Sequence, residues 1–204
     1  MLDDAGLNDC GIVLSNDLDE YSITSIKSEG GVFTSLGVGT KLVTAYDQPA
    51  LGGVYKLCAT QDQSTGKWLP HMKISESSQK TTIPGVLNVK RFKDNNGKLA
   101  GDMIFDESSS AECKTYIVDP MDNLRRKNLD NYKSDLLLKP LFRQGKFVGK
   151  KTDVMECQKN AIIGLESLDE TQKRILNPHT YPVGLEASLN ERRIQIVAEM
   201  RGLK

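Results

Sequence analysis

Residues 32–46 read VFTSLGVGTKLVTAY, and this stretch decides how the rest of the chain is interpreted. An apolar run suited to a strand, 32–36, ends in the turn GVGT at 37–40, and residues 41–43 predict a short helical turn. Glycines let the backbone approach an oxyanion closely, so that several N–H groups converge on it. The same pattern also occurs in ordinary tight turns, so it predicts an anion site only together with its neighbours.

A second strand is expected just upstream. Residues 11–14 (GIVL) form an apolar run without alternation, which predicts a strand buried on both faces. The run ends at 15–17 (SND), and residues 18–28 have the apolar spacing of a helix. Because a strand–helix–strand unit pairs its strands in parallel, residues 15–17 are expected beside 37–40 on one rim. In α/β folds that rim is where ligands bind.

Asp17 has two interpretations, which do not exclude each other. A carboxylate beside an anion loop can accept hydrogen bonds from ribose hydroxyls or hold a divalent metal ion. The same residue is also a candidate N-cap for the helix that follows. In the loop itself, Thr40 adds a hydroxyl donor. A β-carbon at Gly39 would intrude on the anion or strain a backbone that needs positive φ.

The rest of the chain predicts three regions. Residues 1–51 carry the rim, 52–119 form an antiparallel β region, and 120–204 are mixed and end in amphipathic helices. Strands are expected at 53–59, 67–74, 88–93 and 102–105, with a hairpin turn at 94–97 (DNNG). Residues 135–141 fit either a strand or a packed loop. Helices are expected at 168–176, after a capping box, and at 185–201, with Arg192 and Arg193 on the solvated side.

Composition excludes several classes of function. Basic and acidic residues number 27 each, so neither nucleic acid nor a membrane surface is expected as the main partner. No apolar run approaches the ~20 residues of a membrane helix, and the N-terminus lacks the features of a signal peptide. We therefore expect a cytoplasmic protein. Residues 1–5 resemble the last turn of a helix that Gly6 stops, so we expect the chain to open inside a domain.

Cysteines and histidines do not predict a catalytic or metal site, and metal ligands cannot be assigned. The four cysteines are scattered singly, which argues against zinc and disulfides, and Cys58 is expected in the core of a strand. His71 and His179 have no nucleophile or metal-ligand partner at a recognisable spacing.

Several stretches together resemble the nicotinate phosphoribosyltransferase family. They are SNDLDE at 15–20, GVGTKLVT at 37–44, QPALGGVYKL at 48–57, KISE with KTTIPG at 73–76 and 80–85, and the segment 178–189. Members of this family join nicotinic acid to phosphoribosyl pyrophosphate, which gives nicotinate mononucleotide and pyrophosphate. ATP hydrolysis is coupled to the step, Mg²⁺ is used, and the product feeds NAD salvage.

The resemblance implies a fold and a set of site residues. The fold would be the C-terminal part of an irregular phosphate-binding, TIM-like α/β barrel with an antiparallel β region, usually paired into dimers. Gly37, Gly39 and Thr40 would lie at the ribosyl phosphate, and Asn16 and Asp17 near the ribose and phosphate. The family's earlier barrel strands, which carry the nicotinate contacts and a phosphorylated histidine, have no counterpart here.

That departure leaves alternatives open. The chain would be the C-terminal half of the enzyme, inactive alone and dependent on a missing N-terminal half or a homodimer partner. A non-catalytic module that binds phosphate or nucleotide is a second interpretation. Nicotinamide or quinolinate phosphoribosyltransferase is a third, which the run at 48–57 disfavours.

Overall fold

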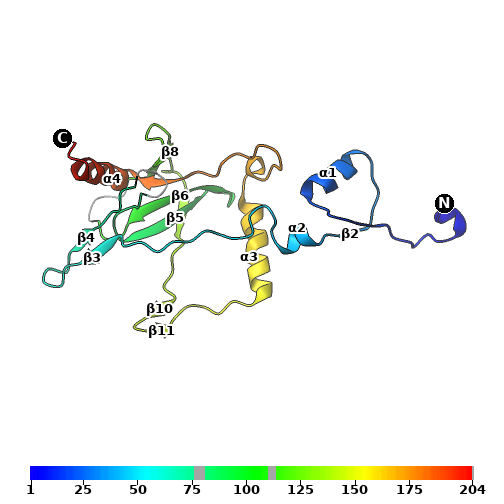
Figure 1. The fold of residues 1–204 in the computed structure, drawn as a ribbon, viewed down its shortest axis with the longest axis horizontal. Coiled ribbons are helices and arrows are strands. Elements are labelled where there is room, and N and C mark those ends of the chain that lie inside the picture. The colour runs from blue at the N-terminus through cyan, green and yellow to red at the C-terminus, as the bar shows by residue number, and fades with distance from the viewer. Residues whose placement is uncertain (76–80, 110–113, 204) are drawn as a thin grey trace. The chain divides into compact units, whose positions relative to one another are not determined.

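The computed structural model describes residues 1–75, 81–109 and 114–203 (Figure 1). The chain divides into two compact units, Met1–Tyr55 and Lys56–Lys204. Both contain helices and strands, so the mixed α/β class expected from the sequence is confirmed.

The first unit is built around one strand–helix–strand motif. Its elements are η1 (Asp3–Ala5), β1 (Val13–Ser15), α1 (Glu20–Ser28), β2 (Ser35–Gly37) and α2 (Thr40–Val43). β1 and β2 pair in parallel, as predicted, with Leu14 opposite Leu36. The first turn, η1, ends at Gly6, which adopts the left-handed conformation with φ 76° that favours glycine.

Two details of this unit differ from the sequence prediction. The strand predicted at 11–14 begins at Val13, and its side chains are not buried, since Val13 is 65% exposed. The reason is that the unit contains only a pair of three-residue strands and few helical residues to cover them. Asp17 is not the N-cap of α1, because the helix begins two residues later and Asp19 caps it.

The second unit centres on a six-stranded sheet in the order β8-β7-β12-β6-β5-β9. Its strands are β5 (Leu87–Lys93), β6 (Leu99–Asp106), β7 (Tyr116–Val118), β8 (Arg126–Asn128), β9 (Lys133–Leu136) and β12 (Val183–Glu186). All neighbours are antiparallel except β12 and β6, which run parallel. Because the sheet takes strands from both 52–119 and 120–204, the two regions expected separately from the sequence share one sheet.

The other elements of this unit come before, between and after the strands of the sheet in the sequence. They are the hairpin β3 (Ala59–Gln61) and β4 (Trp68–Pro70), the short hairpin β10 (Phe142–Arg143) and β11 (Lys146–Phe147), α3 (Val154–Ser167), η3 (Glu170–Gln172) and α4 (Ala187–Met200). Among the helices of the described residues, none has the length and apolar composition needed to cross a bilayer.

The core of the second unit lies on the sheet. Its main cluster comprises Phe92, Ala100, Met103, Ile117 and Leu129. Strand β12 fits tightly between its neighbours, because a β-carbon at Gly184 would lie 2.7 Å from the carbonyl oxygen of Val118. The carboxyl end of β12, where α4 begins, is therefore fixed by the sheet.

The hairpin predicted at 94–97 is confirmed. It joins β5 to β6, and the Asp94 carboxylate accepts hydrogen bonds from the backbone N–H groups of Asn96 and Lys98, both at 2.8 Å. Gly97 takes the left-handed conformation with φ 80°. The strand expected at 53–59 is wrong, since pairing begins only at Ala59, and Cys58 is half-buried outside any strand.

Two helix predictions need correction, and one helix was missed. Residue 185 belongs to β12 and is fully buried, and α4 begins only at Ala187, because the sheet takes the residues before it. The helix expected at 168–176 is the single turn η3, capped by Asp169. The longer helix α3, whose N-cap is Asp153, was not predicted.

The expected solvation of Arg192 is also wrong. Its guanidinium forms an ion pair with the carboxylate of Asp106, which is 7% exposed and lies at the end of β6. For Arg193, partial burial lowers the pKa of the guanidinium.

Candidate functional site

The carboxyl ends of β1 and β2 form the rim expected from the sequence. Ser15 and Gly37 are opposite each other in the last register position, and Ser15 Oγ donates a hydrogen bond to the carbonyl oxygen of Gly37 over 3.4 Å. The turns after both strands enclose a hollow of about 440 Å³, the rim hollow, lined by Ser15, Asn16, Asp17, Leu18, Gly37, Val38, Gly39, Thr40 and Lys41. All five site residues predicted from the sequence line this hollow.

The first turn has an unusual backbone. Asn16 and Asp17 adopt positive φ values of 95° and 48°. Asparagine and aspartate are the side chains that tolerate this region best after glycine. Within the described ranges, the Asp17 carboxylate makes no hydrogen bond or ion pair, so its acceptor capacity remains available to a ligand.

Asp19 rather than Asp17 fixes the start of α1. Its Oδ1 accepts a hydrogen bond from the Ser22 backbone N–H at 2.8 Å, while Ser22 Oγ accepts one from the Asp19 N–H at 2.9 Å. Hydrogen bonds from the backbone and hydroxyl of Ser22, with the nearby charge of Lys41, hold the pKa of Asp19 below its usual value. The capping task that the sequence left open for Asp17 is thus performed by Asp19.

The second turn is shaped by its two glycines, each in a different way. A β-carbon at Gly37 would lie 3.0 Å from Ser15 Oγ, closer than an ordinary contact, so the Ser15 side chain would have to shift. At Gly39 the expectation of positive φ is wrong, because its φ is −100°. A β-carbon there would meet no protein atom within 4 Å.

Thr40 begins α2. The carbonyl oxygen of Gly39 accepts hydrogen bonds from the N–H groups of Leu42 and Val43, both at 3.1 Å, which closes the first turn of the helix. The N–H groups just before them have no partner inside a helix, since the first donors of any helix lack one. The turn therefore offers backbone donors and the Thr40 hydroxyl at the hollow.

Lys41 is a residue of the rim hollow that we did not predict. Its ammonium nitrogen lies 3.7 Å from the ring centroid of Tyr46 and 4.0 Å from Asp19 Oδ2. The signal was present, since a basic residue directly after a G-x-G-T turn adds the charge that an anion site favours. Lys41 supplies the hollow's cation.

Mg²⁺ is the metal that the family resemblance implies. Among the described residues, no group of three or more His, Cys, Asp or Glu side chains is placed to hold a metal ion. Mg²⁺ is commonly held by one or two carboxylates together with substrate phosphates and water. The Asp17 carboxylate fits as one such ligand.

The two histidines lie outside the rim hollow. His71 Nε2 is 2.7 Å from the Thr60 hydroxyl oxygen, and His179 lines a hollow of the second unit with Asp169 and Thr171. Cys10, Cys58 and Cys157 are free thiols, and Cys113 lies outside the described residues.

The motif KTTIPG is partly explained by packing. Residues 76–80 lie outside the described residues, but Pro84 is fully buried and Gly85 has a φ of 121°. A β-carbon at Gly85 would lie 2.6 Å from Asp106 Oδ2, and Asp106 Oδ1 accepts the N–H of Val86 at 3.0 Å. Asp106, itself paired with Arg192, therefore anchors the end of the motif.

Comparison with known proteins identifies the family. A model described as the nicotinate phosphoribosyltransferase C-terminal domain matches residues 88–193. Nicotinate phosphoribosyltransferase of Bacillus subtilis is 35% identical over 98% of this chain and 41% of its own length. The human protein of that name is 29% identical over 87% of this chain and 32% of its own length.

A solved structure has the same fold. The crystal structure of human nicotinic acid phosphoribosyltransferase matches with a TM-score of 0.66 and 24% identity, over 95% of this chain and 34% of that chain. The chain thus spans less than half of the length of these relatives. It belongs to the nicotinate phosphoribosyltransferase family, and it corresponds to the C-terminal part of that family's members.

Proposed function

We propose that this chain acts in nicotinate phosphoribosyltransferase activity. The reaction joins nicotinic acid to phosphoribosyl pyrophosphate, with ATP as co-substrate and Mg²⁺, and releases nicotinate mononucleotide and pyrophosphate. The observation that carries the proposal is the rim hollow, which brings the turn at Asn16 and Asp17 beside the G-x-G-T turn. A hollow with backbone donors, a hydroxyl, a lysine and an open carboxylate suits a ribose phosphate with its metal ion.

Each residue of the rim hollow then has a chemical role. The backbone at Gly37 and Gly39 and the hydroxyl of Thr40 hold the ribosyl phosphate. Asn16 can donate from its amide to the ribose or phosphate. Asp17 accepts hydrogen bonds from the ribose hydroxyls or holds Mg²⁺, and Lys41 neutralises part of the phosphate charge.

The proposal extends to the architecture around this hollow. β1 and β2 would be the last strands of an irregular phosphate-binding, TIM-like α/β barrel, completed by the part of the relatives that this chain does not span, or by a partner chain. Two observations support it: the strands pair in parallel, and their apolar side chains are exposed in the first unit. We further propose that the assembled enzyme is a cytoplasmic dimer.

A chimeric enzyme tests the function. In it, this chain replaces the segment of the Bacillus subtilis relative with which it aligns. We expect a cooperatively melting chimera to form nicotinate mononucleotide from nicotinic acid, phosphoribosyl pyrophosphate, ATP and Mg²⁺. The same assay on the 204-residue chain alone is expected to show only background.

The control variant is at Thr44, the C-cap of the helix that Thr40 begins. Thr40→Val removes the hydroxyl at the rim hollow, whereas Thr44→Val removes a hydroxyl that donates to the Thr40 carbonyl oxygen at 2.6 Å and does not line the hollow. We expect Thr40→Val to lower kcat/KM for phosphoribosyl pyrophosphate about tenfold, since a hydrogen bond to a charged group is lost. A folded chimera that binds phosphate without turnover would instead support a non-catalytic binding module.

A further inference from the structure

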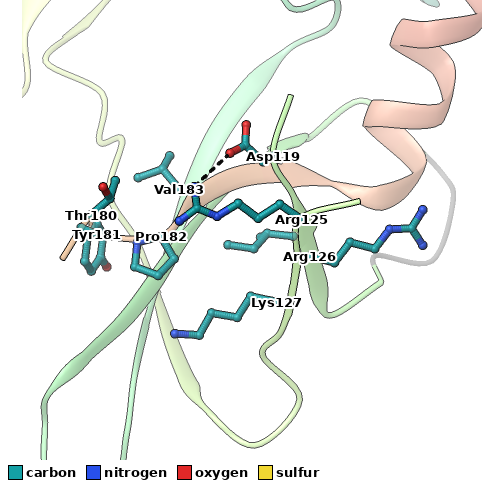
Figure 2. Close-up of a pocket in the computed structure, with 9 residues that line it drawn as sticks. Asp119, Arg125, Arg126, Lys127, Thr180, Tyr181, Pro182 and Val183 are labelled. Atoms are coloured by element: carbon teal, nitrogen blue, oxygen red, sulfur yellow. Dashed lines mark ion pairs between the residues drawn. The ribbon is translucent and has the colours of Figure 1, made fainter. Parts of the chain in front are cut away.

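A second hollow, in the second unit, has the features of an anion site and is separate from the proposed catalytic function. It measures about 260 Å³ and lies between β8 and the segment that leads into β12 (Figure 2). We call it the β8 hollow. It is lined by Ile117, Asp119, Arg125, Arg126, Lys127, Thr180, Tyr181, Pro182 and Val183. Ile117, Pro182 and Val183 give it an apolar floor.

Two cations extend toward the opposite wall of this hollow. Lys127 lies in the edge strand β8, and Arg125 directly precedes that strand, two positions before Lys127. Figure 2 shows both extending toward Pro182, while Arg126 extends the other way. The Arg126 guanidinium instead lies 5.9 Å from the ring centroid of Tyr116, and its Nε donates to the Asn123 carbonyl oxygen at 3.1 Å.

The opposite wall is held in place by partly buried polar contacts. The Tyr181 hydroxyl donates to Asp102 Oδ1 at 2.8 Å, and the Asp102 N–H donates to the Pro182 carbonyl oxygen at 2.9 Å. Asp102, which is 7% exposed, is paired with Arg91 through two hydrogen bonds of 2.9 and 2.7 Å. Burial and the neighbouring Asp102 raise the pKa of Tyr181, so its hydroxyl stays a neutral donor to that carboxylate. Thr180 is thereby presented on a fixed segment.

Several hydrogen-bond donors of the β8 hollow are not used in hydrogen bonds within the protein. Lys127 Nζ donates to the Ala100 carbonyl oxygen at 2.6 Å, which leaves two of its three N–H donors. Arg125 Nη1 is 3.8 Å from Asp119 Oδ2, beyond hydrogen-bond distance. Across the described residues, the Thr180 hydroxyl has no hydrogen-bond partner. Two cations facing the hollow therefore meet a single carboxylate.

We propose that the β8 hollow binds a phosphate group through Arg125, Lys127 and Thr180. An arginine fork suits two oxygens of a phosphate, and a lysine and a hydroxyl complete the donors. The hollow is smaller than the ~300–1,000 Å³ of pockets that enclose whole ligands. The phosphate is therefore either free or the end of a larger monoester whose remainder extends past the apolar floor.

Residue-resolved titration by nuclear magnetic resonance tests this site apart from the rim. Inorganic phosphate and ribose 5-phosphate are added separately to the ¹⁵N-labelled chain. Amide signals of 125–127, 180, 181 and 183 report the β8 hollow, and those of 37–40 report the rim hollow. We expect saturable shifts at 125–127, 180, 181 and 183 with both ligands. Equal dissociation constants identify free phosphate as sufficient, and tighter binding of ribose 5-phosphate identifies a monoester.

Two variants and a matched control decide the assignment. Arg125→Ala is expected to weaken phosphate binding at the β8 hollow about tenfold, and Thr180→Val to weaken it as well. Arg126→Ala removes an equal charge from the next residue and is expected to change the affinity less than about twofold. The Arg125 and Thr180 side chains lie at the hollow, whereas the Arg126 side chain extends away from it, and melting curves check that each variant folds. Equal losses for Arg125→Ala and Arg126→Ala, or shifts that never saturate, would overturn the proposal.

Discussion

Ser15 and Gly37 meet at the last register position of the parallel β1–β2 pair, where the Ser15 hydroxyl donates to the Gly37 carbonyl oxygen over 3.4 Å. This contact holds two turns of different sequence side by side at the carboxyl ends of their strands. One turn contributes polar side chains, and the other contributes glycine backbone and the Thr40 hydroxyl. The proposed ribose phosphate site depends on that pairing.

The two aspartates near α1 are expected to separate binding from stability. Asp17→Gly should weaken binding of phosphoribosyl pyrophosphate in the chimera and leave the melting temperature nearly unchanged, because glycine tolerates the φ of 48° and the Asp17 carboxylate makes no hydrogen bond or ion pair within the described residues. Asp19→Ala should lower the melting temperature, since it removes the N-cap of α1. Calorimetry and thermal melting on both variants measure the affinity and the melting temperature. A variant at position 17 that lowered both its affinity and its melting temperature would contradict this prediction.

Substitutions of the two glycines of the second turn are likewise expected to differ in their effects. Gly37→Ala places a β-carbon 3.0 Å from Ser15 Oγ, so the Ser15 hydroxyl must move from its hydrogen bond to the Gly37 carbonyl oxygen, and we expect a small drop in melting temperature. A β-carbon in Gly39→Ala meets no protein atom within 4 Å, but the φ of −100° and ψ of −111° lie outside the main allowed regions of L-residues, so we expect a folded variant with some backbone strain. If the phosphate lies where we propose, Gly39→Ala still weakens its binding. Normal phosphate affinity in a folded Gly39→Ala variant would argue against that position.

Acid stability of the second unit is expected to depend on Asp106. Burial alone would raise the pKa of Asp106, but hydrogen bonds from Ser108 and Arg192 outweigh it and lower the pKa. The stability that the Asp106 carboxylate contributes is therefore fully present above about pH 3.9, the ordinary pKa of an aspartate. It is lost as the pH falls through the lower pKa that Asp106 has in the folded state.

Melting curves between neutral pH and about pH 3 test the Asp106 prediction. Asp106→Asn should be less stable at neutral pH and should lose less stability on acidification than the wild type. Asp130→Asn, an exposed aspartate of the same unit, serves as the control and should follow the wild-type curve. An Asp106→Asn curve parallel to the wild type would contradict the assigned role.

The core prediction concerns Met103, which is completely buried in the main cluster. Met103→Ala is expected to cost about 2–5 kcal/mol of unfolding free energy, since it removes packed atoms and leaves a cavity. Met155→Ala, on the exposed side of α3, is the control and should change the free energy by less than about 0.5 kcal/mol. Urea denaturation of both variants gives the two values.

The rim could be predicted because its signals are local. The apolar run before residues 15–17, the helix spacing and the G-x-G-T turn each indicate one element, and parallel pairing then follows from general topology. Burial could not be predicted in the same way. An apolar strand sequence such as that around Val13 indicates that other residues should pack over the strand, and the first unit does not contain such residues.

The errors in the second unit come from contacts distant in sequence. Leu185 and Leu189 have helical spacing, yet the slot between β6 and β7 holds Leu185 in an extended strand. The helical pattern alone predicts that Arg192 is solvated, because its partner Asp106 comes from another element. By contrast, α3 had a local signal that was overlooked, because Asp153 precedes it and accepts the Glu156 N–H at 2.8 Å.

The most direct test of the central claim is a calorimetric titration of the chimera and its Thr40→Val variant. Nicotinate mononucleotide, inorganic phosphate and nicotinic acid are the three ligands, and Thr44→Val is the control. We expect Thr40→Val to weaken the two phosphate ligands by roughly 1.5–3 kcal/mol and to leave nicotinic acid unchanged, because nicotinic acid presents no phosphate. If nicotinic acid affinity falls as much as mononucleotide affinity, residues 37–40 do not bind the phosphate.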